Sequence, residues 1–471
     1  MLAILPLMVL VPVIAALASL LVDRNHAYRI SLIASGIVLT LTAAAAYFAW
    51  VGGLGSLSFS YSYIPGLNVS LSLQLTDLSF ILTVMTSIVF FAASIVGGYF
   101  LGSDERIYNF VFLLCEAGSL GIFLSSNLFL FYVFWEIAEM TMFFIIFIYG
   151  GYGRRYAAIK FIVYSLMSSL LLLIAIMLLY VNTSPHTFDI STIMSVAGSI
   201  PAGTQMLVML LLLVAFMIKL PVFPFHSWLP DAHTEAPTTG SMILAGVLLK
   251  FGGYGLLLML MLVPLALHYA MYMAIIFAFS AIYAGFVALR QSNIKRLIAY
   301  TSITDMGVVA VGIAAASIFG TSGALYAMLS HGLAISLLFL IAGTLDHVYG
   351  TLEIDRIRGV ITRFPGLTYL FIIGTFAVVG IPLTAGFIGD LLVFIASYHG
   401  FGIVGLLPLI GIFVIGAALF WIIERMFVNV SKVTEPYEIV EGAVIYSGAF
   451  LVAATIVFGV LPFILLGISG L

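Results

Sequence analysis

Charged residues and cysteine are both scarce in this sequence. Charged side chains make up 7% of the 471 residues, whereas 63% of the residues are hydrophobic. This composition excludes a soluble domain, because too few polar side chains remain to cover its surface. The single cysteine, Cys115, excludes an internal disulfide, a thiol redox pair and an iron–sulfur cluster held by this chain alone. The sequence therefore predicts one all-α polytopic membrane protein.

Long apolar runs fill almost the whole chain. A membrane-spanning helix needs about 20 apolar residues, and the runs between breaks predict about 14 such helices with short loops. The first run, Met1 to Val22, lacks a basic n-region and is long enough to span, so we expect a retained helix rather than a signal peptide. Residues 52–76 are rich in Ser, Gly and Tyr and partly alternating, which predicts a short hairpin on the membrane surface.

Basic residues are absent from every second predicted loop. Of the 16 Lys and Arg residues, 14 fall in odd-numbered loops and none in even loops or at the termini. These 14 are Arg24, Arg29, Arg106, Arg154, Arg155, Lys160, Arg290, Lys295, Arg296, Arg356, Arg358, Arg363, Arg425 and Lys432. By the positive-inside rule, the odd loops face the cytoplasm or an organelle matrix, and both termini face the opposite side. A single missed helix would break this alternation, so it supports 14 helices.

Proline interrupts two of the predicted helices. Pro221 follows Lys219 at the end of an apolar run, and Pro382 interrupts the run 367–397. A broken helix at membrane depth is tolerated only where it is buried in protein or lines a wet cavity. The breaks at Lys219-Leu220-Pro221 and Gly380-Ile381-Pro382 lie five helices apart, which predicts two five-helix repeats of opposite orientation, a pattern of transporters.

These repeats divide the sequence into four expected segments. They are residues 1–106 with helices 1–3 and the hairpin, 107–263 with helices 4–8, 264–425 with helices 9–13, and 426–471 with helix 14.

Ionisable residues inside the predicted helices are the main functional candidates, because each costs at least about 2.5–3.5 kcal/mol at a helix centre. They are spread over seven helices: Glu116, Glu136, Glu139, Lys219, Lys250, Asp305, His331 and Asp390. Roughly one titrating group per helix is typical of a proton path. A metal site needs closely spaced, converging ligands, and His226 and His233 are seven residues apart, so we expect no metal site. Both histidines remain secondary candidates for the path.

Pairing determines whether a buried lysine or carboxylate keeps its charge. Burial alone favours the neutral form, and an opposite charge nearby reverses that tendency. At about 4 Å and an effective dielectric constant near 20, the attraction is roughly 4 kcal/mol, so breaking such a pair is expected to release a proton. Lys219 and Lys250 have no cheap structural use in mid-bilayer. A purely structural role stays open for the other candidates, above all for Glu116 and Glu139.

Four stretches of the sequence form a recognisable set. They are FYVFWE (131–136), PFHSWLPDAHTEAPTTGSMILAGVLLKFGGYG (224–255), NIKRLIAYTSITDMG (293–307) and HGLAISLLFLIAG (331–343). This set resembles the signature of the antiporter-like subunits of respiratory complex I, membrane-bound hydrogenases and Mrp-type cation/proton antiporters. The similarity covers roughly residues 75–400. It implies a 14-helix fold with two inverted five-helix repeats, two broken helices and a central row of proton-carrying residues.

The resemblance also implies roles for individual residues. At matching positions the helix-5 glutamate is Glu136, its helix-7 lysine partner is Lys219, the central helix-8 lysine is Lys250, the helix-11 histidine is His331, and the exit-side residue of helix 12 is Asp390.

Differences within the family indicate a subtype. Most members carry a lysine where Ile335 stands and another at the position of Asp390, whereas the subunit M (mitochondrial subunit 4) type carries an acid at the latter. The usual acid there is glutamate, and the family often has histidine at the position of Asp305, so the second half of the path is expected to be tuned differently. A long lateral helix of the subunit L type is not expected after helix 14.

The implied function is proton translocation driven by redox partners, in a prokaryotic cell membrane or an organelle inner membrane. The chain has no dinucleotide fingerprint or flavin motif, so flavin, iron–sulfur or NiFe centres are expected on partner subunits. Expected partners are other membrane subunits, including further antiporter-like ones, peripheral redox subunits, the lipid bilayer, and H⁺ or Na⁺, but no nucleic acid. An Mrp-type Na⁺/H⁺ antiporter subunit and a structural scaffold held together by buried charges remain the alternatives.

Overall fold

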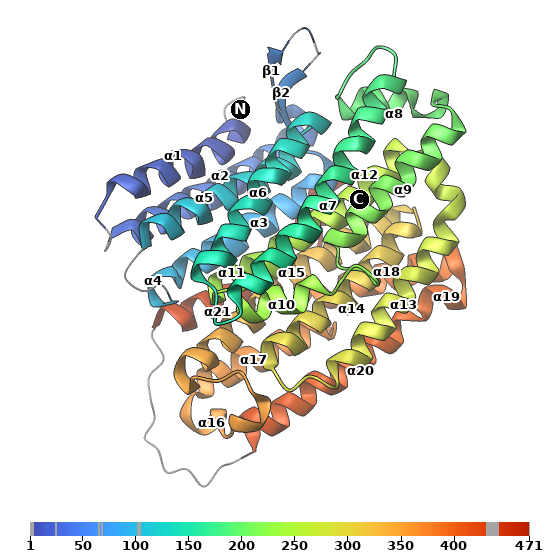
Figure 1. The fold of residues 1–471 in the computed structure, drawn as a ribbon. Coiled ribbons are helices and arrows are strands. Elements are labelled where there is room, and N and C mark those ends of the chain that lie inside the picture. Colours follow the sequence, from blue (N-terminus) through green and yellow to red (C-terminus); the bar gives the residue numbers. More distant parts are fainter. Residues whose placement is uncertain are drawn as a thin grey trace.

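The computed structural model describes residues 4–23, 26–64, 66, 69–100, 105–429 and 442–470. Two of the basic loop residues, Arg24 and Lys432, lie outside the described residues. The described chain is a bundle of helices with one two-stranded hairpin (Figure 1). The all-α class predicted from the apolar runs is confirmed.

The elements follow one another as α1 (Ile4–Leu21), α2 (Ala27–Gly52), β1 (Ser58–Ile64), β2 (Val69–Gln74), α3 (Asp77–Ile95), α4 (Gly97–Phe100), α5 (Glu105–Leu124), α6 (Leu128–Tyr149), α7 (Arg154–Asn182), α8 (Ile190–Val196), α9 (Ala202–Lys219), α10 (Trp228–Glu235), α11 (Thr238–Ile243), a π-helical turn (Leu244–Leu248) and α12 (Leu249–Leu262). They continue as α13 (Ala270–Ala288), α14 (Ile294–Ala314), α15 (Ile318–Tyr349), α16 (Val360–Arg363), α17 (Pro365–Val378), α18 (Ala385–Phe401), α19 (Ile403–Leu406), α20 (Pro408–Ile422), α21 (Gly442–Val460) and α22 (Phe463–Ser469).

Thirteen helical segments in the described part of the chain are long and apolar enough to cross a membrane. The broken helix predicted around Pro382 is not among them, because its halves α17 and α18 have only 14 and 17 residues. Counted together, these halves supply the fourteenth span. The predicted helix count is therefore recovered, with the interruption at the expected place.

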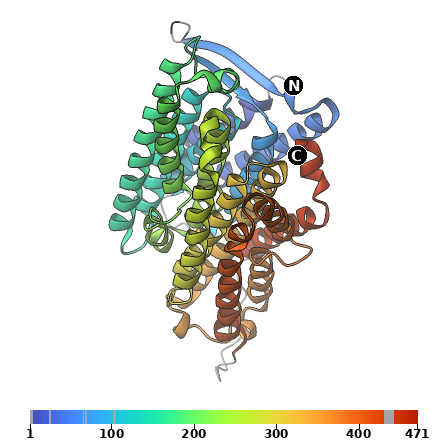
Figure 2. The ribbon, with the colours of Figure 1, turned by 90° about the vertical axis from the view of Figure 1, so that its right-hand side faces the viewer.

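The hairpin marks one end of the bundle and α16 the other (Figures 1 and 2). Strand β1 pairs antiparallel with β2, with Ser58 opposite Gln74, so the hairpin predicted within residues 52–76 is confirmed. The backbone of β2 also contacts the turn before α6, where the Ser126 amide donates to the Ser72 carbonyl at 3.2 Å.

A repeated local structure reveals the internal inversion. Asn127 caps the amino end of α6 and forms a β-bridge with Asp189, which follows α7; Asn293 caps α14 and forms the same bridge with Glu353, which follows α15. The first bridge adjoins β2 at the hairpin end, whereas the second precedes α16 at the opposite end. The two halves therefore repeat the same structure in opposite orientations.

The two helix breaks share one backbone pattern. After α9 ends at Lys219, the Val222 amide donates to the carbonyl five residues earlier; after α17 ends at Val378, the Ile381 amide does the same. This pattern matches Lys219 with Val378. The sequence suggested aligning the two repeats on Pro221 and Pro382, and that alignment differs by two residues from the one that the backbone pattern gives. The end of the helix, and not the proline, therefore sets the register.

The buried centre of the bundle is formed by α11, α12, α14 and α15. The most apolar stretch of α15 is entirely buried, and that of the span from α11 to α12 is 94% buried, whereas only 33% of the corresponding stretch of α2 is buried. Peripheral helices such as α1, α2 and α21 therefore carry much of the exposed apolar surface, and polar groups on α12, α14 and α15 lie in the shielded interior of the bundle.

Candidate functional site

A buried ion pair joins α9 to α6. The Lys219 ammonium lies 2.7 Å from a carboxylate oxygen of Glu139, and the two side chains are 1% and 2% exposed. The rings of Trp135, Phe161, Trp228 and Phe251 surround the ammonium, with centroids 5.2–6.0 Å away. Aromatic faces attract a cation, so both the carboxylate and the rings stabilise a charged lysine at the first helix break.

The acid that contacts Lys219 is not the one predicted from the sequence. The resemblance named Glu136 as the partner, but the ion pair is formed by Glu139, one turn further along α6. Glu136 is only partly buried and lies beside Tyr132. Ser169 of α7 donates a hydrogen bond of 3.4 Å to the second oxygen of Glu139.

A second buried pair joins α12 to α15. The Lys250 ammonium lies 2.7 Å from Nδ1 of His331 and donates to the Ala245 carbonyl at 2.6 Å. That carbonyl belongs to the π-helical turn before α12, where the regular α-helical hydrogen bonds are interrupted. The turn thus supplies a backbone acceptor for a lysine that is 0% exposed.

The remaining primary candidates, Asp305 and Asp390, meet at one small cavity. Its volume is about 20 Å³, and its walls include Asp305, Ser330, His331 and Asp390. Asp305 Oδ2 lies 4.0 Å from His331 Nε2, beyond direct hydrogen-bond distance. The structure thus brings together residues of α14, α15 and α18 that the sequence placed in one path.

Three secondary candidates lie apart from these pairs. Glu116 is fully buried and accepts a hydrogen bond of 2.7 Å from Ser35 of α2, which fits the structural role left open for it. His226 packs against Tyr283, with ring centroids 5.3 Å apart, in the loop before α10. His233 is fully buried and stacks on Phe339 of α15 at 4.4 Å.

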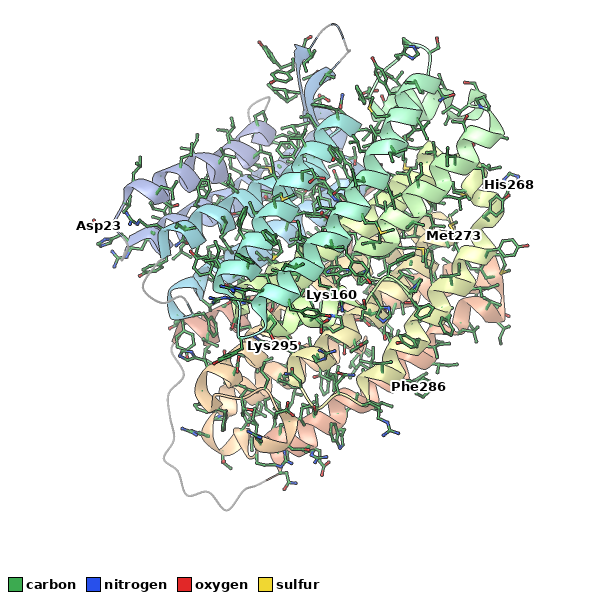
Figure 3. The ribbon with its side chains drawn as sticks, viewed as in Figure 1. Asp23, Lys160, His268, Met273, Phe286 and Lys295 are labelled. Carbon is green, nitrogen blue, oxygen red and sulfur yellow. The ribbon has the colours of Figure 1, made fainter. Side chains whose placement is uncertain are left out.

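Two charged groups that the sequence reasoning assigned to a loop or left aside form ion pairs between helices. Lys295 begins α14 with a side chain that is 4% exposed; its ammonium donates to the Ala236 carbonyl at 3.4 Å and lies 3.8 Å from Asp346. Asp231 of α10 binds Lys160 of α7 at 2.7 Å and Arg296 of α14 at 2.8 Å. Lys160 and Lys295 are labelled in Figure 3. The sequence signal that could have revealed Lys295 as a buried residue is its position at the start of a helix, directly after Ile294.

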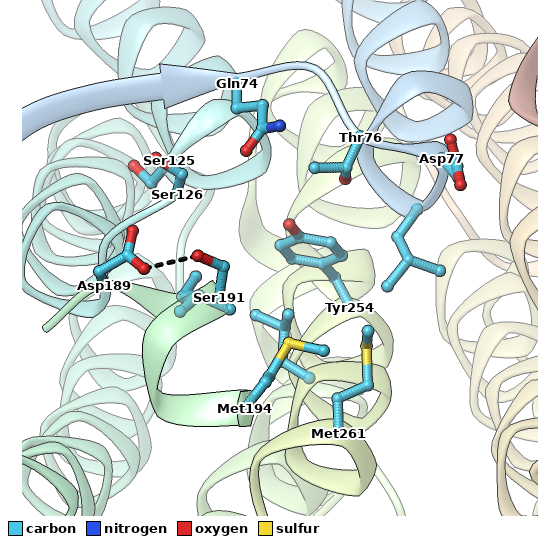
Figure 4. A pocket seen from close by; sticks show the side chains of 13 residues that line it. Gln74, Thr76, Asp77, Ser125, Ser126, Asp189, Ser191, Met194, Tyr254 and Met261 are labelled. Carbon is cyan, nitrogen blue, oxygen red and sulfur yellow. Dashed lines mark hydrogen bonds between the residues drawn. The ribbon is translucent and has the colours of Figure 1, made fainter. Parts of the chain in front are cut away.

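A separate cavity of about 250 Å³ lies near the hairpin end, between β2, α8 and α12 (Figure 4). Tyr254 lies between Asp77 and Asp189 in this view, and Asp189 accepts a hydrogen bond from Ser191 at 2.7 Å. Across the residues that the structure describes, no group of three or more His, Cys, Asp or Glu side chains is placed to hold a metal ion.

Comparisons with known proteins identify a family that this chain matches. Residues 125–418 match the family described as NADH:quinone oxidoreductase/Mrp antiporter, TM. NADH-quinone oxidoreductase subunit M of Rickettsia prowazekii is 40% identical over 340 residues, which cover 72% of this chain and 69% of that protein.

Two solved structures share the fold. A chain of respiratory complex I from Thermus thermophilus superposes with a TM-score of 0.89 at 27% identity, covering 99% of this chain and 97% of that one. A chain of the Mrp complex from Dietzia sp. DQ12-45-1b gives a TM-score of 0.88 at 19% identity, covering 99% and 96%, which is a likeness of fold alone.

Proposed function

Because this chain belongs to the NADH:quinone oxidoreductase/Mrp antiporter transmembrane family, we propose that it is a proton-translocating, antiporter-like subunit of the subunit M type in a complex I-type membrane complex. The single observation that carries the residue assignment is the buried ion pair between Lys219 and Glu139 at the first helix break. Such a pair is costly to bury, and its position beside non-helical backbone favours a path over a scaffold.

The Lys219–Glu139 pair is the switch on the input side. While the pair is intact, the carboxylate holds the lysine charge. A change in a neighbouring subunit that draws the two groups apart leaves each of them buried without a counter-charge, and both then favour the neutral form. The lysine therefore loses a proton and the glutamate gains one, so that their separation moves protons within the membrane.

The Lys250–His331 pair is the central station, and Asp305 and Asp390 form the output side. Lys250 Nζ and His331 Nδ1 are already at hydrogen-bond distance, 2.7 Å, so a proton passes between them without movement of the backbone. Imidazole suits a relay because its two nitrogens exchange protons near neutral pH. His226, His233 and Glu136 have accessory places along the path in this proposal.

Partners supply the redox chemistry. Flavin, iron–sulfur or NiFe centres belong to peripheral subunits, and further antiporter-like subunits lie beside this one in the membrane. The basic odd loops face the cytoplasm or matrix, and both termini face the other side. The two inverted repeats comprise residues 107–263 and 264–425.

Proton translocation by the complete complex tests this proposal. The complex is purified with Lys250→Met or Lys219→Met, reconstituted in vesicles, and assayed for redox-driven acidification with a pH-sensitive dye. We expect assembly with loss of most proton translocation. Translocation at the unsubstituted rate by both variants would show that the buried lysines only hold helices together.

Identification of the co-purifying subunits separates the complex I-type assignment from its alternative. Purification in mild detergent should recover subunits with iron–sulfur or flavin centres. Recovery of small membrane subunits alone, together with Na⁺-dependent proton exchange, would assign the chain to an Mrp-type antiporter.

A further inference from the structure

The end of the bundle that carries the hairpin has an uneven balance of charge. The even loops and the helix ends beside them contain no Lys or Arg, and they hold two acidic residues, Asp77 at the start of α3 and Asp189 before α8. Both aspartates line the cavity of about 250 Å³ between β2, α8 and α12 (Figure 4). The acidic side chains that the sequence places at this end therefore meet at one cavity.

The two carboxylates have no basic partner among the described residues. No basic side chain lines the cavity, and neither Asp77 nor Asp189 belongs to an ion pair in the described part of the chain. Burial raises the pKa of Asp189, but hydrogen bonds from Ser191 and Thr192 outweigh it and keep this carboxyl ionised at neutral pH. A cleft lined by charge of one sign concentrates the opposite ion, so the cavity attracts a cation.

The equivalent acid of the second repeat has different surroundings. Asp189 forms a β-bridge with Asn127, as Glu353 does with Asn293. Two arginines follow Glu353 within five residues, whereas Asp189 lies at the end of the bundle without basic residues. The inversion of the repeats thus leaves the charge of Asp189 available to a ligand and makes Glu353 its matched control.

The rest of the wall determines which kind of cation fits. One side of the cavity is apolar and consists of Leu78, Ile190, Met194, Leu258 and Met261. An inorganic cation such as Ca²⁺ needs about six to eight oxygen ligands around it, which a wall of Leu and Met does not supply. The volume is also far above the roughly 10–15 Å³ that one water needs. Apolar walls with a few polar groups are typical of sites for small organic ligands.

Tyr254 supplies an aromatic face in the same cavity. This residue is 3% exposed, and its ring lies between Asp77 and Asp189 in Figure 4. The face of an aromatic ring attracts an ammonium group, most strongly where water is excluded. The cavity therefore combines negative charge, an aromatic face and an apolar wall.

We propose that this cavity binds a small organic ammonium ion, with its charge beside Asp77 and Asp189. The ring of Tyr254 faces the charge, and the apolar body of the ligand packs against Leu258 and Met261. The site uses none of the residues of the proposed proton path, so it is a binding activity separate from proton translocation.

The first test compares two probes of nearly the same shape on the whole purified complex. The cation is phenethylammonium and the neutral probe is phenethyl alcohol, both radiolabelled and measured by equilibrium dialysis. We expect the cation to bind at least about tenfold more tightly, the gain associated with a hydrogen bond to a charged group. Equal binding of the two probes would overturn the proposal, and this comparison needs no variant. Displacement of the cation by Ca²⁺ at a lower concentration than the probe would also overturn it, because it would show a metal site.

The second test changes the charge at equivalent positions of the two repeats. Asp189→Asn removes the charge and keeps the cap of α8, because Asn caps a helix as well as Asp does. We expect phenethylammonium to bind at least about tenfold more weakly to Asp189→Asn and unchanged to Glu353→Gln. Unchanged binding to Asp189→Asn, or equal losses in the two variants, would refute the assignment.

The third test examines the aromatic face and the position of the ligand. Tyr254→Leu should weaken binding of phenethylammonium by about threefold or more, whereas Tyr254→Phe keeps the ring and most of the affinity. A cryo-EM map of the complex with this probe should show density in the cavity that is lost in Asp189→Asn. Density only at other places would contradict the site. None of these measurements depends on proton translocation, so their outcome is independent of the proposed function.

Discussion

Substitution of Glu139 by glutamine removes the negative charge beside Lys219 while leaving the shape of the site nearly unchanged. At 2.7 Å and an effective dielectric constant of about 20, the direct attraction in this pair is about 6 kcal/mol. Removal of one partner of a buried pair usually destabilises a protein by about 3–5 kcal/mol, because the other charge stays buried and unpaired. We therefore expect Glu139→Gln to lower the thermal stability of the complex and to abolish most proton translocation.

A double substitution separates stability from transport. Glu139→Gln combined with Lys219→Met leaves no buried charge at this site, so stability should return toward that of the unsubstituted complex. Proton translocation should stay lost. Stability is measured by the temperature at which the subunit dissociates in mild detergent, and transport by dye acidification in vesicles.

Glu136→Gln is the matched control, because it changes the same residue type one turn away and leaves the ion pair intact. It should retain stability and lose less of the transport rate than Glu139→Gln. Equal losses for Glu136→Gln and Glu139→Gln, or normal proton translocation by the double variant, would refute the assignment of the switch to Lys219 and Glu139.

Three further predictions concern the framework. Gly252→Ala should cost about 1–3 kcal/mol and impair transport, since its Cβ would lie 2.5 Å from the Leu220 amide next to the switch lysine; thermal dissociation measures the loss. Asp231→Asn should destabilise by less than about 1 kcal/mol, with an effect that shrinks in high salt, because its ion pairs to α7 and α14 are partly exposed. Burial raises the pKa of Asp189, but hydrogen bonds from Ser191 and Thr192 outweigh it and lower the pKa below its usual value. The stabilisation that ionised Asp189 gives to the α8 cap is thus complete above about pH 4 and is lost as the pH falls through the lower pKa of the folded state. Amide hydrogen exchange in α8 should detect this loss in the native chain but not in Asp189→Asn.

Much of the fold could be predicted because the membrane imposes simple rules. Apolar length located the spans, and the alternation of basic loops agrees with the 14-helix count. The hairpin and both breaks also lie where turn residues and prolines indicated. The register of the second break could not be predicted, since α17 already ends at Val378, before Pro382 is reached.

The candidate site was predicted in composition but not in pairing. Glu136 and Glu139 are one turn apart on α6, and helical periodicity cannot choose between them. The choice depends on how α6 rotates against α7 and α9, which places Ser169 and Lys219 around Glu139. The contact of Lys250 with Ala245 also depends on a π-helical turn, for which the sequence holds no clear signal.

The π-helical turn sets the angular phase of the span that runs from α11 to α12. Thr238 and Lys250 are twelve residues apart, which in an unbroken α-helix would point them about 120° apart. The one extra residue of a π bulge reduces this difference to roughly 20°. Thr238 packs on Gly343 of α15 and Lys250 reaches His331 of the same helix. One inserted residue therefore lets a single span use the same side for packing and for displaying its lysine, and loss of that residue would rotate the charge away from its partner while the helix itself remained intact.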